Sequence, residues 1–164
     1  MPDGGGTEAF AACVRTPFAT LGITTSRTHL TGLRFLDPAV PAKMPPRDSI
    51  AFLVCVQVQA YLGNPRIAFD LPLHLWGTRH RIAVWEAMQR IPAGQTRGYG
   101  DVARELGSSA RAVGGACGAN PIPLIVPCHR IIAAGGRIGG FMGAAGVGFE
   151  RSIKRWLLTH EGAA

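Results

Sequence analysis

Prolines and glycines divide this chain of 164 residues into short segments, and that division limits what it can fold into. The stretch 37–49, DPAVPAKMPPRDS, contains four prolines and is expected to be a loop. The stretch 133–148, AAGGRIGGFMGAAGVG, is rich in glycine and is expected to be a second loop. It is not a phosphate-binding P-loop, because no Gly-Lys-Ser/Thr follows it. Regular structure is therefore confined to the segments between these loops.

The first half of the chain favours strands. Three short β-prone runs, at 10–15, 21–25 and 30–35, are separated by turn-like stretches and predict a small antiparallel sheet. The apolar segment 50–63 predicts a helix. The segment 64–78, NPRIAFDLPLHLWGT, is expected to form a strand followed by a connector.

The second half favours helices. Apolar residues recur near helical spacing in 79–91, and 149–162 is an amphipathic helix that ends at a glycine. Between them, 99–107 and 108–120 predict two short helices around a glycine turn, the second beginning at serine N-caps. This outline is typical of a helix-turn-helix, although many buried helix pairs have the same pattern.

Together these elements predict a mixed α/β (α+β) fold in two parts. Residues 1–78 would form an N-terminal lobe with a three-stranded antiparallel sheet and one helix. Residues 79–164 would form a mainly helical domain that carries the helix-turn-helix. The boundary is placed at Gly77–Thr78, and the chain length suits two small lobes.

The charge of the chain favours an acidic partner. Seventeen lysines and arginines against ten acidic residues give a formal charge of +7, so nucleic acid is the first candidate and a merely soluble basic protein is the alternative. The N-terminal residues do not have the pattern of a signal peptide, and no apolar run is long enough to cross a bilayer. These features predict a cytoplasmic protein without a membrane partner.

The four cysteines, at positions 13, 55, 117 and 128, have neither the paired spacing of a zinc finger nor the density of a secreted disulfide scaffold. The sequence therefore predicts no disulfide framework and no metal site. Cys128 is distinctive because it lies in the stretch IVPCHRII, next to a histidine. A lone cysteine is usually a buried core residue, so its role as a nucleophile needs further support.

Glu161 offers that support. It lies four residues after Leu157 and eight after Ile153, on the apolar face of the last helix, while Arg151, Lys154 and Arg155 are expected on other faces. A carboxylate on the core side is costly unless it is paired. It is therefore either exposed at a frayed helix end or paired with His129.

In the second case Cys128, His129 and Glu161 would form a relay. His129 would take the thiol proton and Glu161 would orient the imidazolium, leaving a Cys128 thiolate. Adjacent residues of an extended chain point to opposite sides, so Cys128 must lie on a tight turn, which Pro127 suits, or a water must bridge the pair.

Three stretches, GQTRGYGDVA, RAVGGACGANPIPLIVPCHRII and IKRWLLTHEG, resemble the O6-alkylguanine-DNA alkyltransferases, the methylated-DNA–protein-cysteine methyltransferases. The resemblance covers about residues 80–162 in the same order, and TPFATLGI and FDLPLHLWGT extend it less specifically into the first lobe. It implies an RNase H-like lobe at 1–78 and a winged-helix-like DNA-binding and active-site domain at 79–164.

The resemblance also implies direct-reversal DNA repair without a cofactor. The protein would bind the minor groove of duplex DNA, most simply as a monomer that can cluster there, and flip out O6-alkylguanine or O4-alkylthymine. The cysteine would then keep the alkyl group, so each molecule would act once.

Individual roles carry over from matching positions. The resemblance implies that Cys128 accepts the alkyl group, His129 is the water-mediated base, Glu161 orients that base and Asn120 holds the reactive turn. It further implies DNA contacts and a substrate pocket. Tyr99 would rotate the nucleotide and donate to the base, Arg111 would fill the gap in the duplex, the groove-facing residues would be Ala110, Ala112 and Gly114, and the pocket would include Pro123, Phe141 and Met142.

The sequence departs from the family pattern around the pocket. Met142 replaces a small polar residue, and the loop 143–148 is longer and richer in glycine than usual, which suggests a wall that admits larger adducts. Two other functions are considered. A sensor that binds alkylated bases without reacting would not need Cys128. A Cys–His hydrolase would not need a basic helix-turn-helix.

Overall fold

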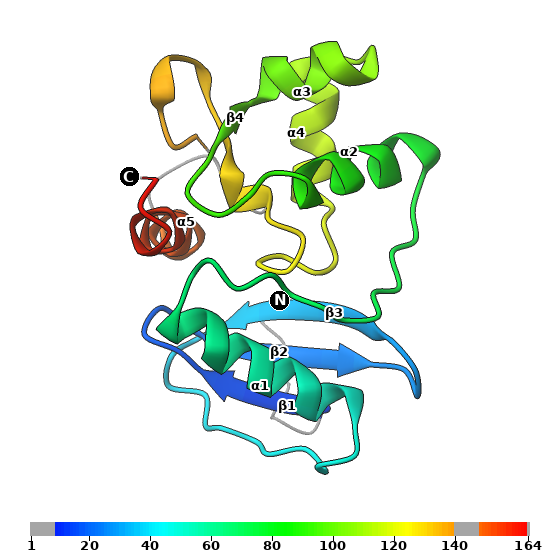
Figure 1. The fold of residues 1–164 in the computed structure, drawn as a ribbon, viewed down its shortest axis with the longest axis vertical. Coiled ribbons are helices and arrows are strands. Elements are labelled where there is room, and N and C mark those ends of the chain that lie inside the picture. The colour runs from blue at the N-terminus through cyan, green and yellow to red at the C-terminus, as the bar shows by residue number, and fades with distance from the viewer. Residues whose placement is uncertain (1–8, 140–147, 164) are drawn as a thin grey trace. The chain divides into compact units, whose positions relative to one another are not determined.

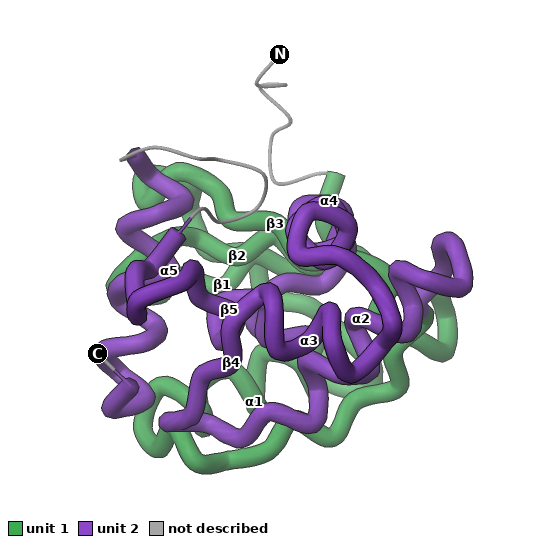
Figure 2. The backbone as a smooth tube through the Cα atoms, turned by 90° about the horizontal axis from the view of Figure 1, so that it is seen from above, with its two compact units in different colours: residues 1–74 green, residues 75–164 purple. Residues whose placement is uncertain are grey.

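The computed structural model describes residues 9–139 and 148–163. The chain divides into two compact units, residues 1–74 and 75–164, which Figure 2 shows in green and purple. The division falls a few residues before the boundary predicted at Gly77–Thr78. The RNase H-like and winged-helix-like names given to the two parts stay predictions.

The first unit is built on a three-stranded antiparallel sheet in the order β1-β2-β3. Its strands are β1 (Ala12–Arg15), β2 (Thr20–Thr25) and β3 (Leu30–Leu36), so the three predicted strands are confirmed. In the register, Ala12 faces Ile23 and Leu21 faces Phe35.

Helix α1 (Ile50–Gly63) packs on this sheet (Figure 1). It begins where predicted, because the Ser49 side chain accepts a hydrogen bond from the backbone N–H of Phe52 at 3.1 Å. Val54, Val58 and Tyr61 are fully buried at helical spacing, and their face forms the core with the sheet.

The strand predicted within 64–78 is wrong. In this segment only a bridge of Leu73 to Leu30 resembles sheet pairing, and the backbone bonds there run from the N–H of Leu30 to Pro72 and from the N–H of His74 to Leu30. Pro65 and Pro72 lack a backbone N–H, so the segment cannot supply a continuous ladder.

The second unit begins with three helices, α2 (Arg79–Gln89), α3 (Tyr99–Leu106) and α4 (Ala110–Gly118), which contact one another. The turn between α3 and α4 follows from Gly107, whose φ of 62° ends α3 in the left-handed conformation, and from Ser109, whose side chain caps α4. The predicted pair of short helices is confirmed. Trp85 of α2 fixes α4 by donating its indole N–H to the carbonyl of Ala116 at 2.8 Å.

The chain then makes a buried turn over 120–127 and enters the 3-10 helix η2 (Cys128–Arg130). Strand β5 (Ile131–Ile132) follows and pairs in parallel with β4 (Arg97–Gly98). A short 3-10 helix, η3 (Ala134–Gly136), precedes α5 (Phe149–His160), which contacts η2. Within the turn Leu124 is buried, yet it has a φ of 75°, a conformation that side chains disfavour.

No helix in the described part of the chain combines the length and the apolar character that crossing a membrane requires.

Candidate active site

Cys128 lies at the first position of η2, directly after Pro127. This 3-10 helix is a tight turn, one of the two arrangements considered for the Cys128–His129 pair. The backbone N–H of Cys128 donates to Val126 at 2.8 Å, and that of Arg130 donates to Pro127 at 3.0 Å. Cys128 is 2 % exposed, so its thiol sits in a fixed and almost water-free position.

Asn120 holds the turn that leads to this cysteine. Its side-chain N–H donates to the carbonyl of Val126 at 2.8 Å, and its side-chain oxygen accepts from the N–H of Ile122 at 3.0 Å. Both bonds are buried, and Asn120 follows Ala119, the C-cap residue of α4. One side chain therefore joins α4 to the backbone beside Cys128.

Glu161 is buried at the end of α5, where three donors surround it. His129 lies 2.8 Å away through Nε2, and Arg130 donates through Nε at 2.9 Å and through a terminal nitrogen at 3.0 Å. The other terminal nitrogen of Arg130 donates to the carbonyl of Ile91 at 2.6 Å. The frayed, exposed glutamate is thus excluded, and the pairing with His129 is the arrangement in the structure.

Burial opposes the charge of Glu161, but the hydrogen bonds from His129 and Arg130 outweigh it and hold the pKa of Glu161 well below its usual range. For His129 burial dominates and lowers the pKa, although the bond to Glu161 acts against this. The pair therefore consists of an ionised carboxylate and a neutral imidazole near neutral pH. The second ring nitrogen of His129, Nδ1, is buried and has no hydrogen-bond partner among the described residues.

Lys154 is a site residue that sequence reasoning missed. It was expected on another face than Ile153 and Leu157, yet its side chain is fully buried. Its ammonium donates to the carbonyl of Ile131 at 2.6 Å and lies 5.9 Å from the ring centre of Tyr99. A signal was present in the sequence, since Leu157 and Leu158 follow at three and four residues and share that side of the helix.

These neighbours set the acidity of the reactive thiol. Burial raises the pKa of Cys128 to about 11, while the hydrogen bond of Asn120 and the positive charge of Lys154 each lower it in part. Burial also lowers the pKa of Lys154 to about 8, and the nearby thiols act in the opposite direction. Cys128 is therefore a protonated thiol at neutral pH. When it ionises, the positive charge of Lys154 stabilises the thiolate.

Tyr99 begins α3 and lines a pocket of about 660 Å³. The same pocket is lined by Ala110 and Gly114 of α4 and by Ala133 and Gly139 after β5. Burial, together with the charges of the two nearby cysteines, raises the pKa of Tyr99 to about 12. The phenol therefore keeps its proton and can donate it in a hydrogen bond.

The other predicted residues fall into two groups. Ala110, Arg111 and Ala112 are exposed at the start of α4, as a groove-facing surface requires. Pro123 is buried in the 120–127 turn and bridges to Val126, away from the lining of this pocket. Phe141 and Met142 lie outside the described residues, as does most of the 143–148 loop.

The described residues contain no group of three His, Cys, Asp or Glu side chains that could hold a metal ion. The four cysteines, all of which lie in the described part of the chain, are reduced and form no disulfide there.

Comparison with known proteins connects this geometry to a family. The family model for the 6-O-methylguanine DNA methyltransferase, DNA binding domain, matches residues 79–163, which is half of the chain. A methylated-DNA–protein-cysteine methyltransferase of Mycobacterium tuberculosis is 39% identical over 147 residues, covering 85% of this chain and 87% of that protein. This chain belongs to the 6-O-methylguanine DNA methyltransferase family.

Two further comparisons of this chain with known proteins are informative. A protein of Thermus thermophilus named DNA base-flipping protein is 44% identical over 135 residues, with 80% of this chain and 88% of that protein covered. The crystal structure of Mycobacterium tuberculosis OGT in complex with DNA superposes with a TM-score of 0.75 at 36% identity and covers 92% of this chain and 91% of that one. The predicted mixed α/β fold is thereby confirmed.

Proposed function

We propose that this protein repairs duplex DNA by direct reversal, moving the alkyl group of O6-alkylguanine onto its own Cys128. The observation that carries the proposal is the Cys128 thiol on a rigid turn, beside a buried His129 that is paired with Glu161 at 2.8 Å. Membership of the family supports the substrate class.

The chemistry is one displacement. The sulfur of Cys128 forms a bond to the alkyl carbon as the bond from that carbon to O6 breaks, and guanine leaves with the electron pair. The thiol proton passes to Nδ1 of His129, directly or through a water, because that nitrogen is buried and has no hydrogen-bond partner among the described residues. Glu161, held ionised by Arg130, stabilises the imidazolium through Nε2.

Tyr99 and Lys154 stabilise the charges that develop. Tyr99 keeps its phenolic proton because its pKa is raised to about 12, so it is suited to donate to the leaving guanine. The buried ammonium of Lys154 lowers the free energy of the thiolate that attacks. No cofactor enters any of these steps.

Single turnover follows from the product. A thioether sulfur has no proton to lose and its carbon–sulfur bond is stable, so alkylated Cys128 is not restored by the residues around it. O4-alkylthymine presents the same alkyl–oxygen bond beside a ring nitrogen, and we include it as a second substrate.

The target base must leave the duplex to reach a cysteine that is 2 % exposed. The start of α4 suits the minor groove, since small exposed residues flank Arg111, and that arginine would occupy the space left by the flipped base. Duplex DNA is thus the proposed partner of a protein that is monomeric in solution and able to cluster on DNA.

A second candidate function is recognition of alkylated bases without transfer. The Thermus thermophilus relative named DNA base-flipping protein favours it. The His129–Glu161 pair beside Cys128 favours transfer instead, because binding alone needs neither a proton acceptor nor a thiol.

One experiment separates the two functions. The protein is incubated with duplex DNA that carries O6-methylguanine, and the intact mass and the mass of the Cys128 peptide are measured. Transfer predicts one methyl group per molecule, located on Cys128, absent in Cys128→Ser and retained in Cys117→Ser, which alters the other buried cysteine of this unit. Unmodified protein that binds the damaged duplex tightly would support the sensor.

A further inference from the structure

The pocket beside Tyr99 has a charged edge that none of the roles above uses. Its lining is otherwise small or aromatic, and its only charged lining residues in the described part of the chain are Asp101 and Arg104 of α3. Arg104 is the cation of the two. Its side chain is 76 % exposed, so it lies at the rim of the pocket and not in its depth.

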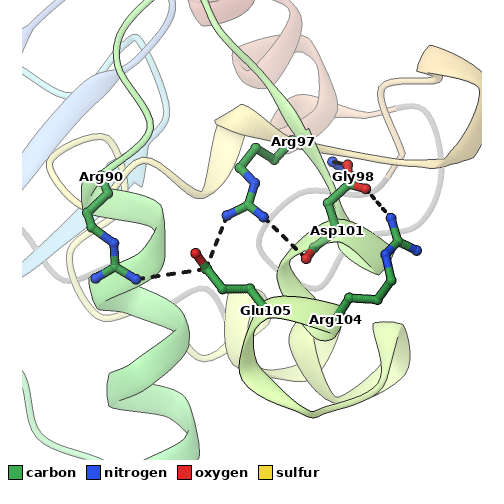
Figure 3. A network of polar contacts seen from close by, with 6 residues as sticks. All are labelled: Arg90, Arg97, Gly98, Asp101, Arg104 and Glu105. Atoms are coloured by element: carbon green, nitrogen blue, oxygen red, sulfur yellow. Dashed lines mark hydrogen bonds and ion pairs between the residues drawn. The ribbon is translucent and has the colours of Figure 1, made fainter.

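One ion pair orients the guanidinium of Arg104. One carboxylate oxygen of Asp101 accepts from a terminal nitrogen of Arg104, while the other accepts from the backbone N–H of Gly98 at 2.9 Å (Figure 3). The other terminal nitrogen passes over Gly100, where the first carbon of any side chain on that residue would lie 3.5 Å from it. The Arg104 guanidinium therefore lies beside Gly100, the residue that follows Tyr99.

The stability of α3 does not depend mainly on the Arg104 side chain. The task of stabilising α3 falls to Arg97, which donates to Glu105 at 3.1 Å and to the carbonyl of Asp101 at 3.2 Å, with Arg90 3.8 Å from the same Glu105 (Figure 3). Arg104 forms one exposed pair three residues along its own helix, and such pairs contribute little to stability. Most of its N–H donors have no hydrogen-bond partner among the described residues.

A planar guanidinium with free donors at the rim of this pocket is suited to an oxygen anion. We propose that Arg104 binds a phosphate of the DNA strand whose flipped nucleotide enters this pocket, and that Asp101 holds the guanidinium ready for it. The inference rests on the proposed function for the identity of the nucleotide. An adduct that ends in a carboxylate would present the same chemistry inside the pocket, and the test separates the two sources.

The test uses a Cys128→Ser background, so that binding is measured without reaction. The Kd for a duplex with O6-methylguanine is determined at several salt concentrations. Arg104→Gln is expected to weaken binding about fivefold at low salt and to reduce the slope of log Kd against log salt by about one. Arg104→Lys should keep most of the slope. Arg155→Gln, which removes an exposed arginine of α5 outside the pocket lining, should leave the slope unchanged.

Two further arms use protein with Cys128 intact. Arg104→Gln should react with free O6-benzylguanine, which has no phosphate, at the unaltered rate. An unchanged salt slope would overturn the proposal. A rate with free O6-benzylguanine that falls as much as duplex binding does would also overturn it. The second arm uses duplex DNA that carries O6-carboxymethylguanine. A loss of reaction rate in Arg104→Gln that is confined to this duplex would also overturn the proposal, because the anion bound by Arg104 would then be the carboxylate of the adduct. If the unsubstituted protein is not alkylated by any substrate, the proposed transfer fails, while the salt slopes still decide the role of Arg104.

Discussion

The ionisation of His129 is fixed by burial and by one carboxylate. Burial lowers the pKa of His129 below 6.5 in the folded chain. As the pH falls below 6.5, the unfolded chain therefore binds a proton at this histidine before the folded chain does. The contribution of His129 to the free energy of unfolding is therefore present in full above pH 6.5 and is lost as the pH falls.

We expect chemical denaturation to record a free energy of unfolding that declines as the pH falls below 6.5. His129→Asn should flatten it, whereas His74→Asn, which alters an exposed histidine of the other unit, should keep the original slope. The same decline in His129→Asn would contradict this origin.

Lys154 sets the reactivity of its neighbour in a different way. Its charge favours the Cys128 thiolate, so Lys154→Met, which keeps the side-chain volume, should raise the pKa of the thiol further. We expect alkylation of Cys128 by iodoacetamide at pH 7 to slow about tenfold, because less of the thiol is ionised. Lys154→Arg should recover part of the rate. A rate in Lys154→Met equal to that of the unsubstituted protein would remove the electrostatic role.

These two residues also mark what the sequence could and could not predict. The Glu161–His129 pairing was predictable because a carboxylate at the spacing of Ile153 and Leu157 must meet a partner. The burial of Lys154 was missed, although Leu157 and Leu158 lie three and four residues further on and share its side of the helix. Its acceptor, the carbonyl of Ile131, comes from another element and is apparent only in three dimensions.

At the scale of elements, α1 and α4 each begin at a serine N-cap. The side chains of Ser49 and Ser109 each accept a backbone N–H three residues on, both at 3.1 Å. Replacing either serine by alanine should cost its own unit about 1 kcal/mol of stability in thermal or chemical unfolding.

Only Ser109→Ala should also weaken binding to duplex DNA, because α4 and not α1 carries Arg111. Ser49→Ala is thus its matched control in a fluorescence titration with labelled duplex. Equal loss of DNA binding in both variants would argue against α4 as the DNA-binding element.

The elements themselves were largely predictable, because caps and glycines mark their ends. Helix α1 has the predicted bounds, and Gly107 ends α3 as expected. The error at 64–78 arose because β-prone residues around Pro65 and Pro72 suggest a strand, whereas sheet formation depends on N–H groups that proline lacks. The ion pair between Arg104 and Asp101 at the pocket rim depends on side-chain rotamers, which no sequence pattern determines.

At the scale of the whole molecule, the reaction should change stability. Cys128 is 2 % exposed and close-packed, so a methyl group added to its sulfur must displace its surroundings. We expect the methylated protein to melt about 5 °C lower than the unmodified protein in calorimetry, with mass spectrometry to verify the modification. Cys128→Ala treated with the same DNA should show no shift. An equal or higher Tm after methylation would mean that the surroundings of Cys128 already have room for the methyl group.

Leu124 gives the turn before Cys128 an unusual requirement. The position needs an apolar side chain, because it is 1 % exposed, and also a backbone with φ of 75°. Acceptable amino acids should therefore not rank by hydrophobicity. Isoleucine and valine, as apolar as leucine but branched beside the backbone, should survive a repair-based selection less often than methionine. In a library of all substitutions at position 124, selected for growth with an alkylating agent, branching of the side chain next to the backbone would decide which clones survive.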